Sequence, residues 1–149
     1  MKTAVKLYKR AVELGSTDSM VQLGFFYDFG RKPARLDKQK ALALYKKAAD
    51  LGDPNGCFYY ARTVCPDLTK YTLEDAMRRD PKILEAAHYY KLAADQGFTE
   101  AEYNLGAMYA NGLGVARDVA EAIRWYERAA AKGDEDAKAA LAPLRALGV

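Results

Sequence analysis

Few side chains of this 149-residue chain have the type and spacing that metal binding or redox chemistry would need. The two cysteines, Cys57 and Cys65, are too far apart in sequence for paired zinc ligands, which typically stand two to four positions apart. No further cysteine could complete a tetrahedral site. On one helix the two would lie about 12 Å apart along the axis, too far for a disulfide. The spacing therefore predicts two free thiols.

A catalytic histidine or a phosphate loop is not expected either. His88 is the only histidine, so a multi-histidine metal site or a catalytic triad would have no second base. Gly112 and Gly114 resemble part of a phosphate loop, but the third glycine, the lysine and the preceding strand are missing, which favours a turn. We expect no catalytic residue, metal or cofactor. An enzyme would need a pocket lined by several ionisable groups.

Composition limits the partners and the compartment. The hydrophobic content of 50% suffices for one domain with a continuous core. The 23 basic and 20 acidic residues leave a net charge of +3, too small for the basic stripe typical of nucleic-acid binding. No stretch approaches the roughly 20 apolar residues of a membrane span, and no apolar signal segment follows the N-terminal lysines. This predicts a cytoplasmic protein, although removal of a signal peptide would leave the same sequence.

A glycine-terminated motif recurs four times and indicates how the chain is organised. The glycines are Gly15, Gly52, Gly97 and Gly133, at intervals of 37, 45 and 36 residues. Such periods are typical of helix-pair solenoids. Before each glycine, a small residue, an aromatic residue and an alanine follow the i, i+4, i+7 spacing of one helical face. The members are Ala4, Tyr8 and Ala11; Ala41, Tyr45 and Ala48; Ala86, Tyr90 and Ala93; and Ala122, Tyr126 and Ala129.

Each glycine is predicted to end a helix, because it can adopt the left-handed conformation that commonly stops helices. We call these helices B. The helices that begin after each glycine, called A, carry a small residue that allows close approach of a neighbouring helix. The small residues are Gly24, Ala61, Gly106 and Ala142. His88 falls off the apolar stripe of its B helix and should be solvated, whereas Trp125 should be largely buried.

The predicted helices span residues 3–14, 17–29, 37–50, 54–64, 81–95, 99–110, 118–131 and 134–147. Asp37, Asp118 and the pair Asp80 and Pro81 supply helix-start signals, since an aspartate can accept the free amide hydrogens of a first turn. The longer middle repeat carries an insertion, residues 66–80, in which Thr72 to Asp75 could begin an extra short helix.

The last full repeat resembles the Sel1-like repeat family. The resemblance rests on its A helix, the glycine turn, a capping aspartate and the B-helix motif, and it extends over essentially the whole chain. The residues are Ala101, Leu105, Gly106, Tyr109, Gly112, Gly114, Asp118, Ala122, Trp125, Tyr126, Ala129 and Gly133. The fold is expected to be all-α: a right-handed α-solenoid of antiparallel helix pairs, related to tetratricopeptide repeats. Residues 1–149 form one domain: a half repeat at 1–15, repeats at 16–52, 53–97 and 98–133, and a terminal helix at 134–149.

The resemblance implies a protein–protein interaction module, an adaptor or scaffold that binds a protein or peptide. A sharper form is a bacterial immunity or chaperone-like protein that neutralises a cognate effector. A hydrolytic enzyme and a fragment of a longer solenoid, whose partner is its own missing repeats, are the alternatives from other classes. Some members with repeated cysteine pairs are secreted and disulfide-linked, whereas this chain has a single pair.

The binding surface is predicted on the side of the A helices that faces away from the core, which is concave in tetratricopeptide solenoids. Helical winding at 100° per residue places a set of largely apolar residues there. They are Val21, Phe25, Asp28, Phe29, Phe58, Arg62 and Tyr103. Exposed apolar area generally marks a contact site. Alternatively, these rings fill gaps between neighbouring A helices. Basic side chains dispersed on the B helices would keep the opposite face soluble, the alternative being that they bind an acidic partner or nucleic acid.

Overall fold

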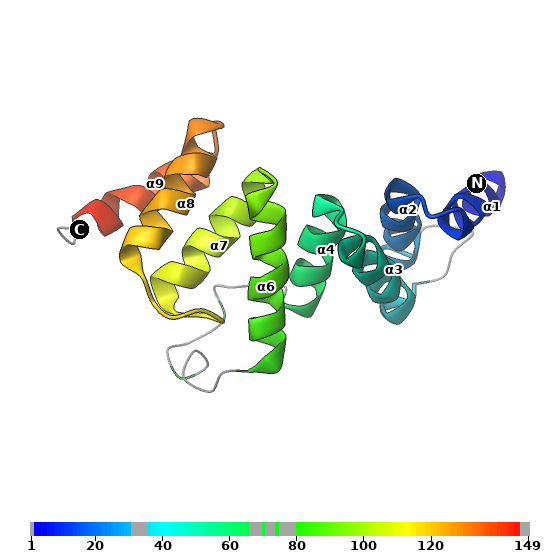
Figure 1. The fold of residues 1–149 in the computed structure, drawn as a ribbon, viewed down its shortest axis with the longest axis horizontal. Coiled ribbons are helices and arrows are strands. Elements are labelled where there is room, and N and C mark those ends of the chain that lie inside the picture. The colour runs from blue at the N-terminus through cyan, green and yellow to red at the C-terminus, as the bar shows by residue number, and fades with distance from the viewer. Residues whose placement is uncertain (1, 31–35, 66–69, 71–73, 75–79, 147–149) are drawn as a thin grey trace.

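In the computed structural model, the described residues are 2–30, 36–65, 70, 74 and 80–146. They contain eight helices that follow one another along an extended molecule, with the two termini at opposite ends (Figure 1). The helices are α1 (Lys2–Glu13), α2 (Thr17–Asp28), α3 (Lys38–Asp50), α4 (Pro54–Val64), α6 (Pro81–Asp95), α7 (Thr99–Asn111), α8 (Val119–Ala131) and α9 (Glu135–Arg145). All eight predicted helices are confirmed. The extra helix predicted at Thr72 to Asp75 falls largely outside the described residues.

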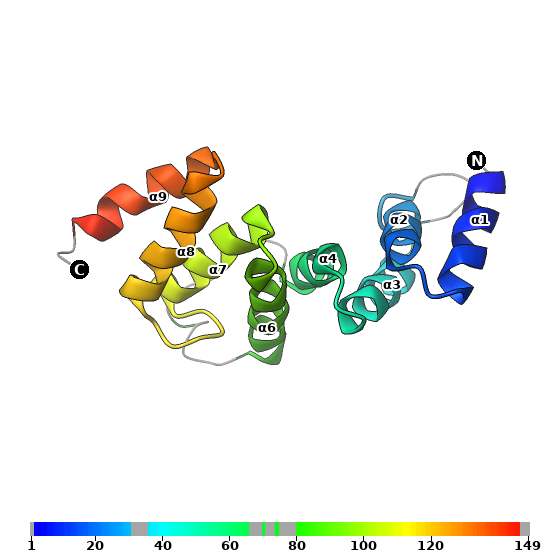
Figure 2. The same cartoon turned by 45° about the horizontal axis from the view of Figure 1, so that its top comes forward.

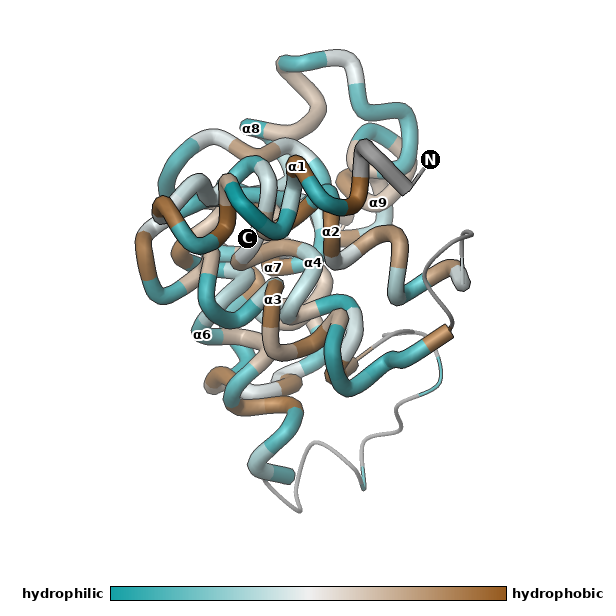
Figure 3. The backbone as a smooth tube through the Cα atoms, turned by 90° about the vertical axis from the view of Figure 1, so that its right-hand side faces the viewer, coloured by the Kyte–Doolittle hydropathy of each residue, from teal (hydrophilic) through white to brown (hydrophobic). Residues whose placement is uncertain are grey.

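Consecutive helices pack against each other in pairs, and the pairs stack along the chain (Figures 1 and 2). The B helices are α1, α3, α6 and α8, and the A helices are α2, α4, α7 and α9. Seen from the N-terminal end, hydrophobic and hydrophilic residues alternate along the helices (Figure 3). This periodicity gives each helix one apolar face, and burying that face against its neighbours builds the solenoid.

The repeated glycines end the B helices as predicted. Gly15, Gly52, Gly97 and Gly133 have φ values of 88°, 88°, 86° and 96°. At the end of α8, the amide of Gly133 donates to the carbonyl of Ala130 at 2.9 Å, and the next amide donates to the carbonyl of Ala129 at 3.2 Å. This pair of bonds is a Schellman motif, which satisfies carbonyls that the helix leaves free. The same pattern turns the chain from every B helix into an A helix.

The predicted helix-start residues are also confirmed. The side chain of Asp37 accepts a hydrogen bond from the amide of Lys40, and that of Asp118 accepts one from the amide of Glu121, both at 3.1 Å. Asp80 accepts from the amide of Lys82 at 2.8 Å, with proline at the first position of α6. These contacts fix where the B helices begin, and therefore which of their residues face the core.

The core consists of the B-helix stripes and the A-helix residues that cover them. In α3, α6 and α8 the stripe residues are at most 5% exposed. Trp125 is 8% exposed, which confirms its predicted burial. Its indole packs under the guanidinium of Arg128, whose central carbon lies 4.7 Å from the ring centroid.

Candidate partner-binding groove

A groove of about 790 Å³ opens along the A helices α4 and α7 and the first turn of α9. We call it the A-helix groove. Two tyrosines of B helices, Tyr90 of α6 and Tyr126 of α8, also line it. Its lining consists of Phe58, Arg62, Tyr90, Thr99, Glu100, Tyr103, Asn104, Ala107, Asn111, Tyr126, Lys132, Gly133, Asp134 and Asp136.

Aromatic rings make the floor of the groove. The ring of Phe58 stacks on Phe98 with centroids 4.8 Å apart and lies 5.9 Å from Tyr90. Further along, Tyr103 and Tyr126 have ring centroids 5.5 Å apart. Phe58 and Tyr90 are at most 2% exposed, whereas Tyr103 is half-buried. The floor is therefore rigid and apolar, and Tyr103 is the ring that a bound molecule can reach best.

Charges of opposite sign stand at the two ends of the groove. On α4, the guanidinium of Arg62 lies over the rings of Phe58 and Tyr59, at 5.7 and 5.0 Å. On the other side, Asp134 and Asp136 lie at the beginning of α9. Burial raises the pKa of Tyr103, and the nearby carboxylates of Asp136 and Asp134 raise it further. Those carboxylates therefore act electrostatically on the groove interior.

The structure brings three of the predicted binding residues together, because Phe58, Arg62 and Tyr103 all line this groove. The expectation that Val21 and Phe58 are exposed was wrong, since they are only 4% and 2% exposed. Winding a single helix ignores the next repeat: the ring of Phe58 is covered by Tyr90 and Phe98. Val21 belongs to the same continuous core. For these two residues, the gap-filling alternative is correct.

Phe25 also fills a gap between repeats. Its half-buried ring lies 4.7 Å from Tyr59 and 6.0 Å from Tyr45, both in edge-to-face geometry. Such pairs stabilise beyond the apolar area that they bury. Phe25, Phe58 and Tyr103 were all predicted on the binding face. Of the three, Phe58 and Tyr103 line the A-helix groove, and Phe25 is not among its lining residues.

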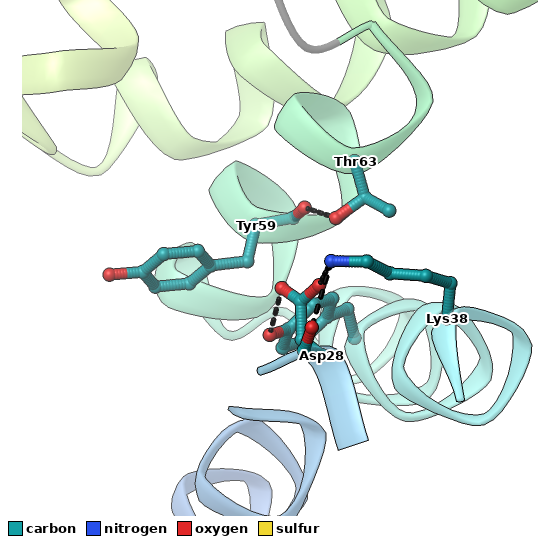
Figure 4. Close-up of polar contacts among 5 residues, drawn as sticks. Asp28, Lys38, Tyr59 and Thr63 are labelled. Atoms are coloured by element: carbon teal, nitrogen blue, oxygen red, sulfur yellow. Dashed lines mark hydrogen bonds and ion pairs between the residues drawn. The ribbon is translucent and has the colours of Figure 1, made fainter. Parts of the chain in front are cut away.

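Asp28 was expected to face solvent, but it is a buried anchor between α2 and α3. Its carboxylate accepts a hydrogen bond from the hydroxyl of Tyr45 at 3.0 Å and forms an ion pair with the ammonium of Lys38 (Figure 4). The same ammonium donates to the backbone carbonyl of Asp28 at 2.8 Å. Burial and the adjacent carboxylate raise the pKa of Tyr45, so it remains a donor. Because its acceptors are occupied, Asp28 positions helices rather than a ligand.

Tyr59 and Thr63 lie beside this anchor on α4. The hydroxyl of Thr63 donates to the carbonyl of Tyr59 at 2.7 Å, a bond within one turn of the helix (Figure 4). A second pocket of about 870 Å³ borders the same region, and Arg62 lines both pockets. Its lining residues are Asp28, Phe29, Lys38, Gln39, Leu42, Arg62, Thr63, Val64 and Lys82. The predicted residues Asp28 and Phe29 therefore belong to this pocket and not to the A-helix groove.

One buried charge escaped the sequence analysis. Glu102 of α7 is completely buried, and its carboxylate lies 2.7 Å from Nζ of Lys132 and 3.1 Å from Nε of Arg128. The Arg128 contact is an ion pair without an aligned hydrogen bond. Lys132 also donates to the carbonyl of Gly97 at 2.7 Å. These partners are distant in sequence, so an isolated glutamate on a helix gave no signal of the pairing.

The histidine occupies the solvated position that the repeat predicted, and the thiols are not joined in a disulfide. Cys57 and Cys65 are both buried. Burial, together with nearby Asp53 and Asp50, raises the pKa of the Cys57 thiol to about 11. His88 is exposed on α6. Among the described residues, no group of three or more metal-binding side chains comes together, and no helix is long and apolar enough to cross a membrane.

Comparison with known proteins places this geometry in a family. Residues 1–16, 17–53, 73–98 and 99–134 match the Sel1 repeat. The chain is 35% identical over 144 residues to the chitin synthase regulator SKT5 of Malassezia restricta, covering 93% of this chain and 9% of that protein. It is 33% identical over 111 residues to HRD3B, an ERAD-associated E3 ubiquitin-protein ligase component of Arabidopsis thaliana, covering 74% and 16%. The chain thus spans less than a fifth of these relatives.

Solved structures share the fold over nearly their whole length. A Sel1 repeat protein from Oxalobacter formigenes superimposes with a TM-score of 0.74 at 28% identity, covering 90% of this chain and 93% of that one. Cysteine rich protein B of Helicobacter pylori gives a TM-score of 0.63 at 26% identity, covering 94% and 93%. Because the matched segments span more than half of its length, the chain belongs to the Sel1 repeat family.

Proposed function

We propose that this chain is an interaction module that holds a segment of a partner protein in the A-helix groove. The observation that carries the proposal is the groove itself. It has a buried aromatic floor, a half-buried tyrosine and polar side chains on three helices. Grooves that bind peptides combine an apolar base, which contributes most of the affinity, with a few polar groups that fix orientation.

The polar lining suits the backbone of an extended segment. Asn104 and Asn111 lie on α7 and line the groove. An amide side chain can donate and accept a hydrogen bond, which matches the N–H and C=O of a peptide unit. The side chain of Asn111 donates to the carbonyl of Ala107 at 2.9 Å and is exposed, so its oxygen can accept from a partner.

Binding is favoured over catalysis although ionisable side chains line the groove. The charged groups are spread over several helices, and the described lining contains no histidine or cysteine. The relatives point in the same direction, because two of them are named as a regulator and as a component of a ligase. Whether the partner is an effector that this chain neutralises stays a prediction from the resemblance.

A site-specific photocrosslinker tests the proposal. In cells that produce the protein, a photoreactive phenylalanine would replace either Asn111 or Lys46. Asn111 lines the groove, and Lys46 is an exposed residue of α3 outside it. We expect a discrete adduct from position 111 that is absent from position 46, and its mass spectrum identifies the partner. The same adducts from both positions, or none above the background without light, would contradict the proposal.

A further inference from the structure

The two ends of the A-helix groove carry opposite charges. At the α4 side stands Arg62, which lies over two aromatic rings and forms no ion pair with a carboxylate of the described residues. At the α9 side stand two carboxylates, those of Asp134 and Asp136, and both act on Tyr103. Arginine and carboxylates at opposite ends of one groove make a dipolar surface.

The carboxylate end stays negative after its neighbours are considered. Lys132 also lines the groove there, but its ammonium is bound to the buried carboxylate of Glu102. Arg128 shares that carboxylate, so this cluster contributes one net positive charge against the two negative charges of Asp134 and Asp136. Asp134 uses one oxygen to cap α9 through the amide of Asp136 at 3.2 Å. Within the described part of the chain, Asp136 forms no ion pair.

We infer that the groove selects an extended segment of a partner protein, an inference that rests on the proposed function. This segment carries an acidic side chain over α4 and a lysine or arginine over α9. The groove runs from α4 past α7 to α9, and with a spacing of about 10 Å between neighbouring helices its two ends are separated by roughly 20 Å. An extended chain advances about 3.3 Å per residue, which places the two partner charges about six residues apart. Residues between them would lie along Tyr103 and Asn104.

Complementary charges would fix the direction in which the segment lies. The reversed segment would bring its basic group to Arg62 and its acidic group to Asp136, and like charges in close contact are strongly unfavourable. Burial of Tyr103 shows that the groove interior is partly shielded from water, which strengthens such electrostatic discrimination. The charges would thus determine specificity, whereas the aromatic floor would contribute most of the affinity.

Selection from a displayed library of random peptides about twelve residues long, enough to span the groove, tests this inference. The folded chain would be the bait, with Arg62→Glu and Asp136→Lys variants selected in parallel. We expect peptides enriched in an acidic and a basic residue about six positions apart. Arg62→Glu should weaken such peptides about tenfold or more and change the enriched acidic residue to a basic one. Asp136→Lys should produce the opposite change at the other end.

Two further variants separate this inference from the proposed function. Ala107→Trp places a large ring in the groove, and Ala139→Trp places the same ring at an exposed position of α9 that does not line it. If the selected peptides require an open groove but lack the charge pattern, only the inference is overturned. The same holds if both charge variants select peptides with the same charge pattern as the parent. Peptides that bind Ala107→Trp as tightly as the parent, or a library that yields no binder, would overturn both. Circular dichroism confirms that each variant is folded.

Discussion

Gly24 of α2 lies against the ring of Tyr45 of α3 so closely that a Cβ at position 24 would stand 2.5 Å from Cε1 of the tyrosine. Gly106 has the same relationship to Tyr126, at 2.9 Å from Cδ1. The repeated small residue of the A helix therefore makes room for the repeated tyrosine of the B helix. This contact sets how closely the helices of a pair approach.

Gly24→Ala should destabilise the protein although alanine favours a helix by about 1 kcal/mol. Tyr45 is fully buried and hydrogen-bonded to Asp28, so its ring cannot turn aside without breaking that bond. Overpacking of this kind costs about 1–3 kcal/mol, so after the gain in helix propensity we expect a net loss of about 1 kcal/mol in urea unfolding. In a Tyr45→Leu background, the same substitution should cost much less. Equal costs in both backgrounds would show that the ring is not the obstacle.

Trp125→Ala should lower the free energy of unfolding by about 3–5 kcal/mol, because it leaves a cavity in the main core cluster and removes the ring under Arg128. Urea unfolding followed by circular dichroism measures the change. Lys91→Ala, at an exposed position on α6, is the control and should have little effect. If the midpoints of Trp125→Ala and the parent coincide, the burial of this residue does not stabilise the fold.

Glu102→Gln should destabilise the protein by roughly 1–3 kcal/mol, because it leaves the Lys132 and Arg128 charges together without their shared carboxylate. Both cations are about half exposed, which limits the cost. Thermal unfolding at low and high salt tests the reason, since salt should screen the repulsion and narrow the difference from the parent. Glu127→Gln removes an exposed carboxylate of α8 and serves as the control. A destabilisation that does not depend on salt would point to lost packing instead.

The Cys57 thiol should resist alkylation at pH 8, because it is buried and its pKa is raised to about 11. Since the unfolded thiol ionises near pH 9, this group stabilises the fold fully below pH 9 and loses its contribution as the pH rises through 11. A thiol reagent should label Cys57 and Cys65 slowly in the native state and rapidly in denaturant. The loss of stability between pH 9 and 11 should be smaller in Cys57→Ala. Rapid native labelling at pH 8 would contradict the buried environment.

The fold could be predicted from sequence because it depends on local signals repeated along the chain. The glycine stops, the aspartate caps and the spacing of Ala41, Tyr45 and Ala48 act within one or two helical turns. Four copies of one pattern reinforce each other, so the helix boundaries were predictable to within a few residues. Trp125 followed from its place in this alignment.

The candidate site was predictable only in part, because it depends on contacts between repeats. A helical wheel placed Phe58 and Asp28 on the outer face, yet the next helices cover both. Arg62 and Tyr103 were correctly placed beside a groove. The carboxylates of Glu100 and Asp136 were missed because they lie in the first turns of α7 and α9, where acidic residues ordinarily stabilise helix starts. Only the packing of both α7 and α9 against α8 brings them into one groove.

The affinity of the cross-linked partner for a chain with a filled groove tests the central claim most directly. Calorimetric titration would compare the parent with Ala107→Trp and Ala139→Trp, after thermal unfolding has shown that both variants are folded. If the A-helix groove holds the partner, Ala107→Trp should weaken binding by about 2 kcal/mol or more, roughly thirtyfold, while Ala139→Trp binds like the parent. Equal affinities for all three chains would contradict the account and place the binding surface elsewhere on the solenoid.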